Sequence, residues 1–94
     1  MKQVHVFISG QVQGVGFRQF IKAQANRLEI TGWVRNLTDG RVEAVLQGEN
    51  EKLAILLSLC QRGPMLSEVK DVNIAWEAIE HQFLDFQKKV NSTL

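Results

Sequence analysis

Residues that build disulfide frameworks, metal centres or membrane anchors are scarce in this sequence. The 94 residues include one cysteine, Cys60, and two histidines, His5 and His81. A single cysteine cannot form an internal disulfide, and these three side chains do not have the spacing of metal ligands. No apolar run approaches the roughly 20 residues of a membrane-spanning helix, and the first residues lack the apolar core of a signal peptide. We therefore expect a cytoplasmic protein with no metal or other cofactor and no membrane partner.

A strong charge of either sign is also missing. Eleven Lys and Arg residues face ten Asp and Glu residues, which leaves a formal net charge of +1. This balance argues against a nucleic-acid partner held by long-range attraction, although it leaves room for a local positive site. The length fits one small domain over residues 1–94, which we expect to be a free-standing monomer. We expect the polar residues 88–94 to form a frayed tail.

The sequence does contain a regular succession of strand and helix patterns. Strand patterns cover residues 4–12, 33–37, 41–47 and 71–76, and residues 82–87 can add a short last strand. Apolar residues three and four apart predict a helix over residues 18–28. A second helix is predicted to start with Asn50 as its N-cap and to stop at Gly63-Pro64.

The predicted order is β-α-β-β-α-β, which is typical of the ferredoxin-like α+β sandwich. In this fold two helices cover one face of an antiparallel sheet. The right-handed crossover rule places the first and third strands in the middle of the sheet, with the second and fourth outside. The loop after the first strand and the end of the second strand then lie close enough to share a site.

A glycine-rich loop joins the first predicted strand to the first predicted helix. It reads Gly10-Gln11-Val12-Gln13-Gly14-Val15-Gly16-Phe17-Arg18. Glycines allow consecutive backbone N–H groups to point at one spot, where the helix adds the positive end of its dipole. The guanidinium of Arg18 matches phosphate bidentately. The loop therefore indicates a phosphoryl site, although the same residues also fit a plain strand-to-helix connection.

Asn36, at the end of the second predicted strand, is the best candidate to act with Arg18. Its amide both donates and accepts hydrogen bonds, so it can orient a water molecule without carrying charge. Phosphoryl transfer depends mainly on positioning and on stabilising charge on the phosphoryl oxygens. No histidine, cysteine or carboxylate pair lies near these motifs to act as nucleophile, base or acid. The residues therefore favour an activated substrate such as a carboxyl-phosphate mixed anhydride, whose carboxylate leaves without a proton.

Two long motifs, one containing Arg18 and the other Asn36, resemble the signatures of the acylphosphatase family. The first is Ile8-Ser9-Gly10-Gln11-Val12-Gln13-Gly14-Val15-Gly16-Phe17-Arg18. The second is Gly32-Trp33-Val34-Arg35-Asn36-Leu37-Thr38-Asp39-Gly40-Arg41-Val42, which closes at Gly48. Arg62-Gly63-Pro64 also resembles the family, and the resemblance extends to about Phe86. Because both long motifs match in order, the signal is more specific than a lone glycine-rich loop.

The resemblance implies hydrolysis of acyl phosphates to a carboxylate and inorganic phosphate, without a metal or a covalent enzyme intermediate. Arg18 would bind the phosphoryl group, Asn36 would hold the attacking water, and the substrate itself can take the water's proton. Inorganic phosphate would occupy the same site as product or inhibitor. The substrate-binding loop would supply the backbone N–H groups of Gln13, Gly14, Val15, Gly16, Phe17 and Arg18.

The C-terminal region departs from the family pattern. Acylphosphatases often end in a firm strand of the form Phe-x-Ile-Arg, whereas residues 83–89 carry Asp85 and no matching arginine. We therefore expect the last strand to pair less firmly with the sheet.

The alternative function is that of a non-catalytic ferredoxin-like binding or regulatory domain, with an anion, a small ligand or RNA as its partner. RNA-binding domains of this topology use aromatic side chains on the open face of the sheet. The open face of the third predicted strand offers Arg41, Glu43, Val45 and Gln47, without an aromatic pair. The sequence therefore favours the enzyme and predicts no nucleic-acid partner.

Overall fold

The computed structural model describes residues 1–91. All the predicted strands and helices are present, and the differences lie at their ends. The elements in chain order are β1 (Lys2–Gln11), α1 (Phe17–Arg27), β2 (Thr31–Asn36), β3 (Val42–Gly48), α2 (Asn50–Arg62), β4 (Glu68–Glu77) and β5 (Phe86–Lys88).

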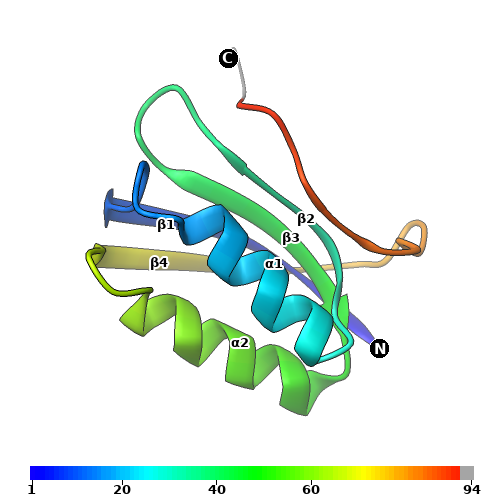
Figure 1. Ribbon diagram of the computed structural model, residues 1–94. Helices are drawn as coiled ribbons and strands as arrows, with labels where there is room; N and C mark the ends of the chain where they lie inside the picture. The colour runs from blue at the N-terminus through cyan, green and yellow to red at the C-terminus, as the bar shows by residue number, and fades with distance from the viewer. Residues whose placement is uncertain (92–94) are drawn as a thin grey trace.

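The strands form one sheet in the order β4-β1-β3-β2-β5, and both helices lie on the same face of it (Figure 1). The ferredoxin-like arrangement is confirmed, with β1 and β3 in the centre and antiparallel pairing from β4 to β2. The short β5, whose pairing was not predicted, adds a parallel pair at the β2 edge. After β4 the chain crosses to the start of β2, where the Gly32 N–H donates to the Asp85 carbonyl at 2.9 Å. From there the chain runs parallel to β2 as strand β5.

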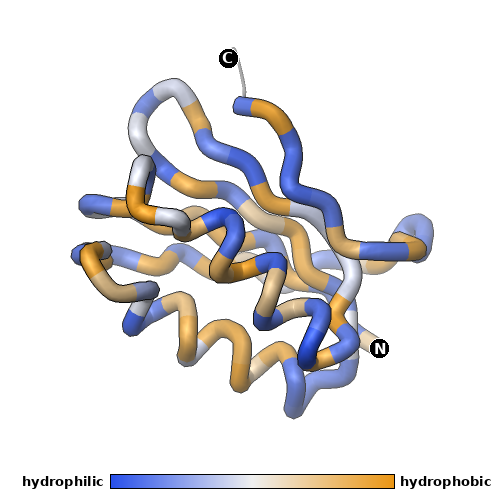
Figure 2. Tube along the Cα trace, viewed as in Figure 1, coloured by the Kyte–Doolittle hydropathy of each residue, from blue (hydrophilic) through white to orange (hydrophobic). Residues whose placement is uncertain are grey.

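Apolar side chains from the strands and both helices meet in one core between the two layers. Figure 2 shows apolar positions alternating with polar ones along the strands and recurring along the helices. Val4, Val6 and Ile8 of β1 are fully buried. Cys60 of α2 belongs to this core, and its burial raises the pKa of the thiol to about 12. The thiol is therefore protonated and inert at neutral pH, as expected from its place on an apolar stripe.

The C-terminal strand lies later in the chain than predicted. β5 contains Phe86, which is buried, and ends at Lys88. The backbone N–H of Lys89 then donates to the Val34 carbonyl at 2.8 Å. Backbone pairing thus includes the first two residues of the expected tail, which belong to the sheet edge. Residues 92–94, the end of that tail, lie outside the described residues.

Several other element ends differ from the predictions by one to three residues, including the starts of β4 and α2. β4 begins at Glu68 rather than at residue 71, because Gly10 and Gln11 of β1 extend the pairing beyond an irregularity in register. The N-cap of α2 is Glu49, in an extended conformation, so Asn50 is the first helical residue and not the cap. Neither difference affects the elements that carry the candidate site.

The register of the central strands places the end of β2 across β3 from the last part of β1. Ile8 of β1, Val42 of β3 and Asn36 of β2 lie in one row across the sheet. Because side chains alternate between the two faces of a strand, Asn36 faces the helices. Arg35 faces the open side of the sheet, where it forms an ion pair with Glu43. The pairing therefore positions Asn36 on the side from which α1 approaches.

Gly32 allows β2 to lie close to β3. Its φ is +137°, and an added Cβ would collide with the carbonyl oxygen of Val45. We expect Gly32→Ala to lower the free energy of unfolding by about 3 kcal/mol or more, measured by urea denaturation, because it adds a backbone collision to conformational strain.

Gly40→Ala is the matched control for this prediction. Gly40 also has a positive φ, +99°, but an added Cβ there would meet nothing within 4 Å. Conformational strain alone should cost about 1 kcal/mol. Equal losses of stability in the two variants would contradict the role given to the Gly32–Val45 approach.

Candidate active site

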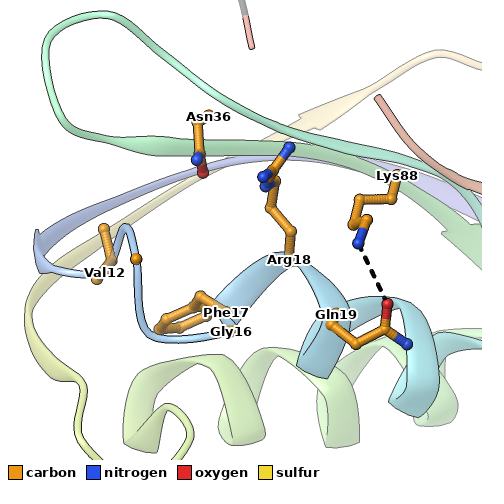
Figure 3. Close-up of a pocket in the computed structure, with 8 residues that line it drawn as sticks. Val12, Gly16, Phe17, Arg18, Gln19, Asn36 and Lys88 are labelled. Atoms are coloured by element: carbon orange, nitrogen blue, oxygen red, sulfur yellow. Dashed lines mark hydrogen bonds between the residues drawn. The ribbon is translucent and has the colours of Figure 1, made fainter. Parts of the chain in front are cut away.

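A small pocket lies where the loop between β1 and α1 meets the end of β2 (Figure 3). Its volume is about 120 Å³. The structure thus brings together the two motifs that were predicted to share a site, and β5 adds a further wall. The residues that line the pocket are Val12, Gly14, Gly16, Phe17, Arg18, Gln19, Asn36 and Lys88.

The loop turns sharply at two glycines before the helix begins. Gly14 and Gly16 have φ values of +76° and +78°, in the left-handed region that favours glycine. Gly16 is the N-cap of α1, where no side chain caps the helix, and no acidic residue lies in the first turn. The first N–H groups of a helix have no partner within the helix, and the dipole makes this end positive. The local structure therefore suits an anion.

Arg18 extends from the first turn of α1 toward β2, beside Asn36 (Figure 3). Its side chain is half-buried, and its Nη1 donates to the carbonyl oxygen of Lys89 at 3.0 Å. No carboxylate within residues 1–91 forms an ion pair with Arg18. The guanidinium is thus held in place by a neutral carbonyl group, and its charge is available to an anionic ligand.

Asn36 is the last residue of β2 and is only 7% exposed. Its side chain points from the sheet toward the glycine loop (Figure 3). An amide in this position can donate to one group and accept from another. The predicted pair of Arg18 and Asn36 therefore lines one pocket from two different elements.

Two residues of the predicted substrate-binding loop do not line the pocket. Val15 packs against the core. The Gln13 amide nitrogen donates to the carbonyl oxygens of Leu37 and Arg41, at 2.7 and 2.9 Å. Gln13 therefore ties the loop to the turn between β2 and β3. Sequence analysis missed this contact, because nothing local to a glutamine indicates a partner so distant in the chain.

Three pocket residues were not predicted as site residues, namely Val12, Gln19 and Lys88. Nζ of Lys88 donates to Oε1 of Gln19 at 3.4 Å (Figure 3). Val12 and Gln19 flank the predicted substrate-binding loop, residues 13–18, so their proximity in the sequence was a usable signal. Lys88 was assigned to the tail, and only the pairing of β5 with β2 brings it to the pocket.

The charge distribution of the pocket differs from that of the surrounding surface. The described lining residues include two cations, Arg18 and Lys88, and no carboxylate. Some surface acids elsewhere have cationic partners. A hydrogen bond from Lys52 lowers the pKa of Glu29, and the Arg41 backbone N–H lowers that of Asp39. The pocket is therefore a local positive site on a nearly neutral protein.

The open face of the sheet carries aromatic side chains on β1 and β2, whereas the third predicted strand, which was used to judge RNA binding, has none. The rings of His5 and Phe7 stack at 4.7 Å, and Trp33 contacts His5 edge-on at 6.3 Å. Both nitrogens of His5, however, contact carboxylates, Glu43 at 2.6 Å and Glu77 at 3.0 Å. The His5 side chain on this face is thus engaged in internal hydrogen bonds.

Residues 1–91 contain neither a metal-ligand cluster nor a membrane-spanning helix. No group of three or more His, Cys, Asp and Glu side chains is arranged to hold a metal ion there. None of the helices in this part of the chain has the length and apolar character to cross a membrane.

Comparison with known proteins agrees with the two sequence motifs. The family profile described as Acylphosphatase matches residues 4–88. A protein of Methylococcus capsulatus named acylphosphatase is 45% identical over 86 residues, covering 92% of this chain and 94% of that protein. One of Chloroflexus aurantiacus, also named acylphosphatase, is 48% identical over 75 residues, covering 80% of this chain and 82% of its own.

A solved structure agrees with the fold as well. The crystal structure of acylphosphatase from Bacillus subtilis matches with a TM-score of 0.92 at 31% identity. The match covers 95% of this chain and 99% of that one. With its motifs, its fold and its relatives in agreement, this chain belongs to the acylphosphatase family.

Proposed function

We propose that this pocket hydrolyses acyl phosphates by direct attack of water on phosphorus. Arg18 and the phosphate loop, residues 13–18, hold the phosphoryl group, and Asn36 holds the water. One observation carries the proposal: an arginine without an ion-pair partner among the described residues, an uncapped helix start and a buried amide line the same small pocket. These are the groups that bind and polarise a phosphoryl group.

The bond changes need no side-chain acid or base. The water oxygen forms a bond to phosphorus while the bond from phosphorus to the acyl oxygen breaks. The electron pair of that bond leaves on the carboxylate, which is a weak base and needs no proton. The proton of the water passes to a phosphoryl oxygen, so inorganic phosphate and a carboxylate are released. The protein supplies orientation and charge, which are the main requirements of phosphoryl transfer.

The proposal requires only one copy of the chain, water and the small-molecule substrate, because the pocket and the loop that forms part of it belong to the same chain. Within it, the enzyme acts as a cytoplasmic monomer without a metal, a cofactor or a nucleic acid. A domain that only bound anions would use the same cations and N–H groups, so turnover distinguishes the two functions.

Hydrolysis of benzoyl phosphate in the presence of a chelator tests this function. We expect turnover by the wild-type chain and competitive inhibition by inorganic phosphate. Arg18→Ala should reduce kcat/KM about 100- to 1,000-fold and abolish phosphate inhibition, because it removes the bidentate donor. Arg27→Ala, at the far end of α1, is the control and should change neither. Phosphate binding without turnover in the wild-type chain would instead favour the anion-binding domain.

The role of Asn36 differs from that of Arg18 and predicts a different kinetic result. Asn36→Ala should lower kcat about 100-fold, because it removes the group that orients the nucleophile. Phosphate inhibition should persist, since the guanidinium and the loop remain. Steady-state kinetics and phosphate titration, after circular dichroism has verified folding, measure both effects. Lost phosphate binding with unchanged turnover would reverse the assigned roles.

A further inference from the structure

Lys88 lines the pocket but has no part in the reaction proposed above. It is exposed, and its Nζ contacts Gln19 at 3.4 Å, which is a long hydrogen bond. Its neighbour Lys89 directs its ammonium elsewhere, over the Trp33 ring at 4.7 Å from the centroid. Successive side chains of an extended backbone point to opposite faces of a sheet. Lys88, the last residue of β5, therefore lines the pocket, and Lys89, which follows it, lies on the open face.

The position of Lys88 relative to Arg18 indicates which part of a substrate it would meet. Arg18 lies between Asn36 and Lys88 (Figure 3). In an in-line displacement the attacking and leaving oxygens lie on opposite sides of phosphorus. With the water at Asn36 and the phosphoryl group at Arg18, the leaving acyl group extends away from Asn36. Lys88 is the charged side chain that lines the pocket on that side.

The charge of Lys88 has no counterpart in the part of the chain that the structure describes. No carboxylate of residues 1–91 forms an ion pair with it. The phosphoryl group already has Arg18 and the N–H groups of the helix start. A neutral acyl group offers nothing for an ammonium to bind, whereas an acyl group with its own carboxylate does.

We propose that Lys88 is a specificity residue that selects acyl phosphates whose acyl group carries a second, negatively charged carboxylate. The substrate class is thus the monophosphorylated dicarboxylic acids. The inference rests on the proposed function, because it uses the in-line geometry at Arg18 and Asn36. Lys88 takes no part in the phosphoryl transfer. It contributes only to binding the acyl group of the substrate.

The test compares 4-carboxybenzoyl phosphate with 4-methylbenzoyl phosphate, an analogue whose acyl group carries no charge. The second compound is called the neutral substrate. A carboxylate in this ring position cannot reach its own phosphate bond, so the substrate does not decompose by internal attack. Lys88→Met should lower kcat/KM for the carboxylated substrate about fivefold, mainly through KM, as expected for a charged hydrogen bond near the surface. The neutral substrate should change by less than about twofold, and Lys88→Arg should retain the preference.

Lys22→Met is the matched control. It also removes one lysine charge, but from α1 and from a residue that does not line the pocket. It should leave the ratio of the two substrates unchanged. Equal losses with both substrates in Lys88→Met, or the same ratio change in Lys22→Met, would overturn the specificity role while leaving the proposed function intact. If the wild-type chain hydrolyses neither substrate, the proposed function itself fails.

Discussion

The register of the pairing among β1, β3 and β2 determines where the candidate active site forms. Ile8, Val42 and Asn36 share one row, so Asn36 lies across β3 from the part of β1 that leads into the glycine loop. A shift of one residue would turn Asn36 to the open face and separate it from Arg18. Gly32 permits the close approach of β2 to β3, and the side chain of Gln13 ties the loop to the turn beyond β2.

In the proposed mechanism acyl phosphates are hydrolysed without acid–base side chains, because the substrate is already activated. The work left to the protein is to hold a phosphoryl group, a water molecule and an acyl group in line. Backbone N–H groups at a helix start and one guanidinium supply the positive charge. Carboxylates near that charge would weaken anion binding, and the described pocket lining contains none. Elsewhere cations do pair with acids, as Lys52 does with Glu29.

Most of the fold and the centre of the site followed from local patterns in the sequence. Period-two strands, helical stripes and the crossover rule predicted the central topology and brought Arg18 near Asn36. Parallel pairing of β5, the contacts of Gln13 and the position of Lys88 did not follow, because each depends on residues far apart in the chain. Lys88 is the clearest example: its polar surroundings in sequence predicted a tail, while backbone pairing through Lys89 places it in the pocket wall.

The central claim is that water held at Asn36 attacks phosphorus and not the acyl carbon. Hydrolysis of benzoyl phosphate in ¹⁸O-labelled water tests this claim most directly, because the label marks the atom that the water attacks. Mass spectrometry of both products should find the ¹⁸O in inorganic phosphate and none in benzoate. Label in the benzoate would show attack at the carbonyl carbon and would contradict the roles given to Arg18 and Asn36.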